Sequence, residues 1–126
     1  MDDAVILGDQ HSRLMAKMME LVQQRQQVIA HNLSNANTPG YIRRDVDFSE
    51  QLARLVRQGD SADIEGLEAQ VIEDRDLPAR LDGNNVQVPR EMNEMMQNGL
   101  MYELLAKAFS TRTSILKMAM QGAQSR

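Results

Sequence analysis

The chain has 126 residues and a net charge of −4, from 14 basic and 18 acidic side chains. Without a basic excess it has no general means of neutralising phosphates, which argues against a nucleic-acid binder. It has no cysteine, which excludes disulfides and cysteine-bound metals, and no apolar run approaches the roughly 20 residues of a membrane helix.

The apolar residues are of an unusual kind. Hydrophobic residues make up 42% of the chain, but only 3% of it is aromatic and ten residues are Met. Aliphatic side chains and Met suit long helices packed side by side, and Met adapts to irregular contacts between chains. The length suits one domain. The Met-Asp-Asp start has no basic segment before an apolar stretch, so we expect no cleaved secretory signal.

The first predicted element is an amphipathic helix over residues 10–38, about 40 Å long. Its apolar residues recur at spacings of three and four, which is the period of a helix face. They are Leu14, Met15, Met18, Leu21, Val22, Val28, Ile29, Leu33 and Ala36. Arg25 and Asn32 fall inside this apolar stripe, where a polar residue usually fixes the register of packing at some cost in stability.

Pro39-Gly40 predicts a sharp end to this helix. Thr38 precedes the proline and is therefore disfavoured in helical conformation. Proline followed by glycine suits the centre of a type II turn, because Gly40 accepts a positive φ without strain. We expect a hard stop and a change of direction here.

The insert over residues 39–88 begins with a short extended segment, in which Ile42, Val46 and Phe48 share one face. Asp47 followed by Glu50 resembles a capping box, and the apolar spacing after it predicts a short helix up to Gly59. For Asp47 both a capping role and an interface role remain open.

The rest of the insert is polar and acid-rich, with Val71-Ile72 as its only strand-like apolar pair. Asp82-Gly83-Asn84-Asn85 predicts a turn, and Val86 and Val88 alternate with Gln87 as in a strand. We expect loops, a small hairpin or partial disorder in this region.

A second long helix is predicted over residues 89–122, with Pro89 at its first position. Its apolar residues form a heptad seam and, beside it, a second row. The seam is Met92, Met95, Gly99, Tyr102, Ala106, Phe109, Thr113, Leu116 and Met120. The second row is Met96, Leu100, Leu104, Ala108 and Ile115. Gly99 and Ala106 would let a neighbouring helix approach closely.

These elements predict one mainly α-helical domain over residues 1–126. Its two long terminal helices pair as an antiparallel coiled coil, with a short mixed loop and hairpin insert between them. The default interpretation of the stripes is the core of a lone bundle. Both stripes are wider than one partner helix can cover, however, so we expect apolar surface that binds neighbouring chains.

Sequence motifs at both ends of the predicted helix pair resemble the flagellar rod and hook axial proteins. The matching segments are Asn32-Leu-Ser-Asn-Ala-Asn-Thr-Pro-Gly-Tyr41, Arg44-Asp-Val-Asp-Phe48, Asp82-Gly-Asn-Asn-Val86 and Glu91-Met-Asn-Glu-Met95, with Tyr102 and Phe109 beyond them. They cover roughly 75 residues. The small insert is similar to that of short proximal rod members. Thr38-Pro-Gly-Tyr41 differs from the Thr-Thr-Gly-Tyr typical of FlgC, and Pro89 stands where the family favours a polar capping residue.

The resemblance implies a non-catalytic subunit of the proximal rod, without cofactors. Such subunits leave the cell through the flagellar type III export apparatus and polymerise into a hollow drive shaft that crosses the periplasm and transmits torque for motility. The implied partners are further copies of the chain, other rod proteins such as FlgC, and the FliE adaptor. No nucleic acid or small-molecule substrate is implied.

The subunit interface that we expect combines both helices with the Pro39-Gly40 turn motif. Its residues are Leu14, Met18, Leu21, Val28, Asn32, Asn35, Asn37, Pro39, Gly40, Tyr41, Asp45, Phe48, Met92, Met95, Gly99, Tyr102, Ala106, Phe109 and Leu116. The asparagines could simply cap the helix end, which suits Asn37. For Asn32 and Asn35 the resemblance favours hydrogen bonds across chains.

Two other classes of function compete with a rod subunit. A soluble coiled-coil adaptor or chaperone would explain the stripes but gives no reason for the Asn-rich Pro-Gly motif. His11 and His31 are the only histidines and lie far apart, so a metal site is not expected. No nucleophile–base pair or phosphate loop is present, so we predict no enzyme activity.

Overall fold

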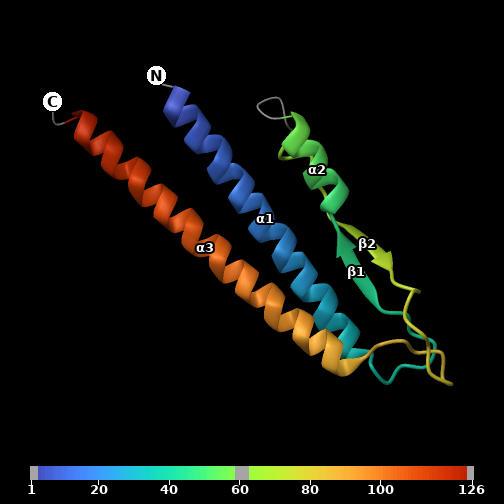
Figure 1. Ribbon diagram of the computed structural model, residues 1–126. Helices are drawn as coiled ribbons and strands as arrows, with labels where there is room; N and C mark the ends of the chain where they lie inside the picture. The colour runs from blue at the N-terminus through green and yellow to red at the C-terminus, as the bar shows by residue number, and fades with distance from the viewer. Residues whose placement is uncertain (1–2, 59–62, 125–126) are drawn as a thin grey trace.

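The computed structural model describes residues 3–58 and 63–124, and it confirms a mainly helical fold. The elements in chain order are α1 (Asp3–Ser34), β1 (Arg44–Asp47), α2 (Ser49–Gln58), β2 (Gln70–Glu73) and α3 (Val88–Gln124). The two long helices α1 and α3 lie side by side and run in opposite directions, so both chain ends lie at one end of the molecule (Figure 1). The expected antiparallel pair with a small insert is thus confirmed.

The bounds of α1 differ from the predicted 10–38. The helix begins earlier, at Asp3, and ends at Ser34. It stops before Pro39 because Asn35 competes for the backbone: its side chain donates to the carbonyl of His31 at 2.9 Å, and Thr38 N donates to Asn35 O at 3.0 Å. Asn35 therefore lies just outside the helix in which we expected it.

The Pro39-Gly40 turn forms as predicted. Gly40 has a φ of 75°, and Tyr41 N donates to Thr38 O at 3.2 Å across the turn. A second turn, far away in sequence, closes with Gly83 N donating to Arg80 O at 2.8 Å. The two turns are joined by a bond from Gly40 N to Asp82 O at 2.8 Å.

The insert contains a two-stranded antiparallel sheet in which Arg44 pairs with Glu73 and Val46 with Val71. The Val71-Ile72 strand is therefore confirmed, although α2 and the residues after it separate the strands, so they form no tight hairpin. The short helix is α2, and its expected end at Gly59 lies outside the described residues. Asp47 Oδ1 accepts Ser49 N at 3.1 Å before the first turn of α2.

The expected strand at Val86 and Val88 is wrong. Val88 opens α3, and Val86 is fully buried without lying in a strand. The reason is that Asn84 supplies side-chain bonds in place of a strand partner: its Oδ1 accepts Val86 N at 2.7 Å. This bend carries the chain directly into α3, one residue before the predicted start at Pro89.

The core lies along α1, which packs against α3 on one side and β1 on the other (Figure 1). Its buried apolar residues are Leu21, Val22, Ile29, Val46, Ile64, Leu67 and Val86. None of these belongs to α3, whose buried residues are the polar Glu91 and Asn98. Of the long helices, α1 is therefore covered on two sides and α3 on one.

Candidate functional site

A cluster of buried polar side chains joins the two helices at the end where the insert leaves and returns. We call Asn32, Arg43, Asn84, Asn85 and Glu91 the polar joint; each is at most 2% exposed. Among the side chains of residues 10–58 and 63–124, every buried nitrogen and oxygen has a hydrogen-bond partner. A buried polar cluster of this kind stabilises one arrangement of its elements only when it is fully satisfied.

Arg43 is the centre of the polar joint. Its guanidinium bonds to Glu91 through Nε, to Asp74 at 2.6 Å through Nη1, and to Glu94 at 3.0 Å through Nη2. Burial by itself would lower the pKa of Arg43, but the hydrogen bond and charge of Glu91, with help from Asp74, outweigh it and raise that pKa. The guanidinium therefore stays charged, and it fastens β1 and the segment after β2 to the start of α3.

The carboxylate of Asp74 responds to the same contacts. Burial would raise its pKa, but a hydrogen bond from Asp76 N and the Arg43 guanidinium together hold the pKa of Asp74 below its ordinary value. Asp74 therefore remains ionised in the folded chain, and its contribution depends on the presence of Arg43.

Asn32 uses both ends of its amide inside the chain. Its Nδ2 donates to Arg44 O at 2.7 Å and to Glu91 at 3.1 Å. Its Oδ1 accepts Arg44 N and the Tyr41 hydroxyl, both at 2.9 Å. Burial, the largest influence, raises the pKa of Tyr41, so this hydroxyl stays a donor. In the single subunit Asn32 thus sets internal register, whereas we had expected bonds across chains.

The two neighbouring asparagines hold the turns. Asn84 Nδ2 donates to Asn35 O at 2.8 Å and to Thr38 O at 2.9 Å. Asn85 Oδ1 accepts Arg43 N, and its Nδ2 donates to Asp74 O, both at 2.7 Å. These amides replace backbone pairing where two loops meet, so the Pro39-Gly40 turn is held against the start of α3.

Two further contacts extend the joint along the helix pair. Asn98 Nδ2 donates to Val22 O and to Gln26 Oε1, both at 2.8 Å, across the α1–α3 boundary. Arg25 pairs with Asp45 at 3.0 Å and with Glu94 at 3.7 Å. The polar residues that interrupt the apolar stripes therefore fix how α1, β1 and α3 align.

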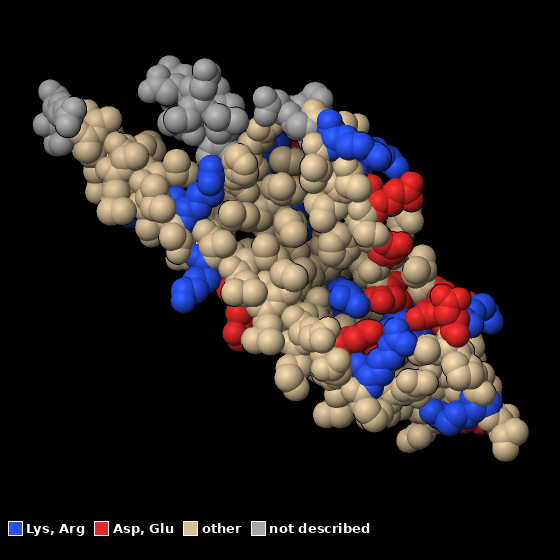
Figure 2. Space-filling view, viewed as in Figure 1, with Lys and Arg blue, Asp and Glu red and all other residues tan. Residues whose placement is uncertain are grey.

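The side of α3 that α1 leaves uncovered is apolar. We call Met96, Leu100, Leu104, Ala108, Ile115 and Met118 the outer face of α3. The first four residues follow one another at four-residue spacings, and Ile115 and Met118 continue the row after a gap of two turns. All six are exposed, and the five large side chains range from 56% for Leu100 and Ile115 to 66% for Met96 and Leu104. Much of the visible surface of the helix pair carries no charge, and charged side chains gather near the strands instead (Figure 2). A long helix with two apolar sides is normally covered on both.

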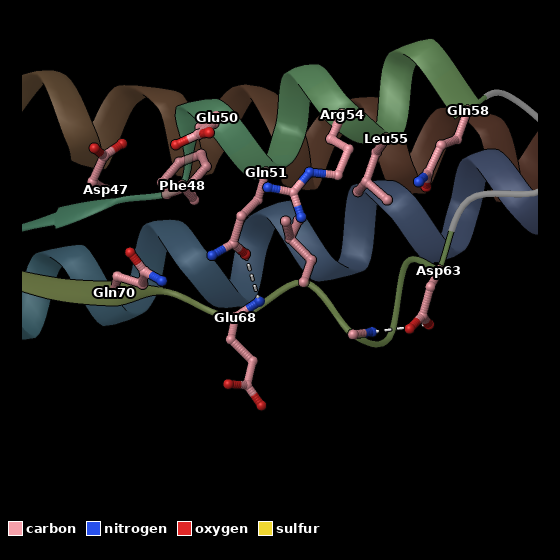
Figure 3. Close-up of a pocket in the computed structure, with 12 residues that line it drawn as sticks. Asp47, Phe48, Glu50, Gln51, Arg54, Leu55, Gln58, Asp63, Glu68 and Gln70 are labelled. Atoms are coloured by element: carbon pink, nitrogen blue, oxygen red, sulfur yellow. Dashed lines mark hydrogen bonds between the residues drawn. The ribbon is translucent and has the colours of Figure 1, made fainter.

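A groove of about 400 Å³ lies between α2 and the segment 63–70 (Figure 3). Gln51 Oε1 accepts Glu68 N at 3.0 Å across it, and hydrogen bonds from Ser49 hold the pKa of Asp47 below its ordinary value. Among the side chains described, those of residues 10–58 and 63–124, no three His, Cys, Asp or Glu residues group as metal ligands. The groove shows no convergent set of reactive side chains.

The structure distributes the expected interface residues over three environments. Leu21 and Asn32 are buried. The half-buried residues are Leu14, Met18, Val28, Asn35, Tyr41, Asp45, Phe48, Met95, Gly99, Ala106, Phe109 and Leu116. The exposed residues are Asn37, Pro39, Gly40, Met92 and Tyr102. Asn32 belongs to the polar joint, Tyr41 bonds to Asn32, and Asp45 pairs with Arg25 next to it. Met92 and Tyr102 are exposed on α3.

Sequence reasoning missed most of the polar joint, including Arg43 and Asn85, and also Asn98, which extends it. One signal was available: Glu91 and Asn98 are seven residues apart and therefore share one heptad position. The predicted seam followed the apolar residue next to each of them, Met92 and Gly99, and was displaced by one residue at those positions.

Comparisons with known proteins define the class. The family model described as "Flagella basal body rod protein" matches residues 19–41, which cover the second half of α1 and the Pro39-Gly40 turn. Within the described residues, no helix is both long and apolar enough to span a membrane. The fold, the turn motif and this match together identify a flagellar rod protein.

Full-length relatives narrow the assignment. The chain is 31% identical to the flagellar basal body rod protein FlgB of Escherichia coli over 117 residues, which span 78% of this chain and 83% of the relative. It is 30% identical to FlgB of Bacillus subtilis over 108 residues, with 78% and 83% covered. It is 27% identical to FlgB of Salmonella typhimurium over 128 residues, with 87% and 92% covered. The chain belongs to the FlgB family of flagellar basal body rod proteins, and it is a structural component and not an enzyme.

Proposed function

We propose that the chain is a subunit of the proximal rod and polymerises, with the outer face of α3 buried against neighbouring subunits. In this role it forms part of the hollow periplasmic shaft that carries torque to the hook. It reaches that place through the flagellar type III export apparatus. Its neighbours are further copies of the chain, other rod proteins such as FlgC, and the FliE adaptor.

The outer face of α3 is the observation that carries this proposal. Its Met and Leu side chains are more than half exposed in a single chain. Complete burial of such a side chain contributes about 1.5–3 kcal/mol, so covering the rest of several of them gives a substantial driving force. Part of that gain offsets the entropy that subunits lose on association.

The polar joint fixes the shape of the surface that a subunit offers to its neighbours. It leaves Pro39, Gly40 and Asn37 exposed at the end of the molecule, while its own amides are engaged within the chain. A subunit built in this way offers neighbours a turn of fixed shape and an apolar helix face. We assign the buried Asn32 to holding that shape, and the exposed residues of the expected interface to contacts with neighbours.

The test replaces part of the outer face without touching the joint. We expect Met96→Asp with Leu100→Asp to leave the helical circular dichroism spectrum of the isolated chain unchanged. In a bacterium whose own copy is replaced by this variant, swimming should be lost and isolated basal bodies should lack the rod. The matched control is Ser110→Asp, which adds one charge at an exposed site of α3 outside the outer face.

Export is measured separately, as the amount of the chain outside the cytoplasm. A variant that is exported but not assembled supports the proposal. Normal swimming and normal rods with both aspartates in place would overturn it, because two charges cannot be buried in an apolar contact without a large cost.

A further inference from the structure

Methionine is the only sulfur-containing residue of the chain. The sequence has ten methionines and neither cysteine nor tryptophan. Thiols and thioethers are the side-chain groups that mild oxidants attack, and here no thiol competes with the thioethers. The places of the methionines in the fold therefore decide what a mild oxidant does to the molecule.

The two long helices expose their methionines differently. On α1, Met15, Met18 and Met19 are half-buried. On the described part of α3, five methionine side chains are exposed. They are Met92, Met96, Met101, Met118 and Met120. An oxidant in solution therefore reaches these side chains of α3 without any unfolding of the helix pair.

Two of the exposed methionines belong to the outer face of α3. Met96 begins the row and Met118 ends it, and they are 66% and 63% exposed. They lie about 33 Å apart along the helix. Between them the row consists of Leu, Ala and Ile side chains, which mild oxidants leave unchanged. Oxidation of the two methionines thus places a polar group at each end of an otherwise apolar row.

We propose that Met96 and Met118 are modification sites, at which hydrogen peroxide converts the thioether to a sulfoxide while the chain is unassembled. The oxidised outer face then no longer binds a neighbouring subunit. This inference rests on the proposed function, in which neighbours cover that face.

The reaction needs only the sulfur and the peroxide. A lone pair of the thioether sulfur attacks one peroxide oxygen, so that the S–O bond forms as the O–O bond breaks. The proton of the transferred oxygen passes to the departing hydroxide, which leaves as water. Sulfur loses two electrons and the peroxide gains them.

The sulfoxide oxygen is a strong hydrogen-bond acceptor. Water satisfies it as long as the outer face is exposed, so the isolated chain keeps its fold. Burial against an apolar neighbour removes that water without replacing its bond, which weakens the contact. A face that a neighbour already covers keeps peroxide away from both sulfurs. Oxidation therefore acts before assembly and not after it.

The first experiment measures where oxidation falls. The purified full chain is treated with hydrogen peroxide, and peptide mass spectrometry follows the sulfoxide at each position. Met96 and Met118 should oxidise on the order of fivefold faster than Met15 and Met18, while the helical circular dichroism spectrum stays unchanged. Equal rates on the two helices would overturn the inference, and so would a loss of helix that accompanies oxidation of the outer face.

The second experiment measures whether oxidised chains enter rods. The strain has no methionine sulfoxide reductases, which would reverse the change, and it starts to make another rod protein only after a brief, low dose of peroxide has been removed. Sulfoxide at Met96 and Met118 should be about tenfold rarer in isolated rods than in the unassembled chains. Sulfoxide at Met101, outside the outer face, should be equally frequent in both pools. Equal frequencies at all three positions would reject the sites.

A competition between two copies separates these sites from general damage. One cell makes the wild-type chain and a tagged variant, so a stronger dose of peroxide acts on both. Met96→Leu with Met118→Leu conserves the apolar volume, and its share of the rods should rise severalfold after the dose. The matched control, Met101→Leu with Met120→Leu, removes as many exposed sulfurs outside the outer face, and its share should stay constant.

An unchanged share for the outer-face pair, or an equal rise for the control pair, counts against Met96 and Met118. If that result appears while Met96→Asp with Leu100→Asp still abolishes rods, the rod function stands and only the modification sites are rejected.

Discussion

The two ends of the helix pair differ in how completely one chain finishes them. At the joint, buried charges and amides bind one another through the Arg43–Glu91 pair and its neighbours. Beyond Asn98, the described part of α3 has no buried residue. The difference shows that contacts within one subunit fix the end that contains the polar joint. The other end leaves apolar surface uncovered, which is available to neighbouring subunits.

The largest expected effect comes from breaking the joint. Glu91→Ala removes the main partner of the buried Arg43 charge, and breaking one side of a buried ion pair costs about 3–5 kcal/mol. We expect a loss of this size in the free energy of unfolding, measured with urea on dilute protein. Glu103→Gln, at an exposed site of α3, should change it by less than about 0.5 kcal/mol. A loss below 1 kcal/mol for Glu91→Ala would contradict the central role of the pair.

The next prediction compares the two ends with matched truncations. Ile29→Ala empties a fully buried site near the joint and should cost about 2–4 kcal/mol. Leu116→Ala, at a half-buried site in the far half of α3, should cost about 1 kcal/mol in the dilute chain. The same urea titrations report both values. Equal costs would mean that the far end is as well packed as the joint.

The sequence alone predicted the parts of this structure that depend on local signals, but not the polar joint. Apolar periodicity predicted both long helices, and Pro39-Gly40 predicted the turn, because these signals are local. The joint depends on bonds between residues such as Arg43 and Glu91, 48 positions apart, and local patterns carry no information about them. The predicted α3 seam was displaced because buried Glu91 and Asn98 looked like solvent-facing residues beside Met92 and Gly99.

A smaller loss of stability is expected from a substitution in the Pro39-Gly40 turn. Gly40→Ala places a Cβ at a φ of 75°, where the surroundings are open but the backbone is strained, and this should cost about 1–2 kcal/mol. Gly99→Ala is the control, because Gly99 is helical with open space around it. That substitution should stabilise the chain by about 0.5–1 kcal/mol. Thermal unfolding of both variants tests the contrast, and a stabilised Gly40→Ala would contradict the turn.

The smallest expected effect is the loss of the contribution of Asp74 to stability at low pH. Because the pKa of Asp74 is lowered by folding, its contribution is present above the unfolded value of about 3.9 and is lost as the pH falls through the folded value. We expect wild type to exceed Asp74→Asn in stability by about 1 kcal/mol or less near neutral pH. The gap should close below pH 4. A gap that persists at pH 2 would show that the carboxylate acts by shape and not by charge.

The separation of the joint's parts along the chain sets an order of events. The polar joint and the contacts that extend it combine residues 22–45 with residues 74–98, and Asn98 bonds back to Val22 across 76 positions. A chain emerging from its N-terminus, from a ribosome or through a narrow conduit, cannot close this joint until its last quarter begins to appear. The chain therefore reaches its final fold only after α3 has begun to appear.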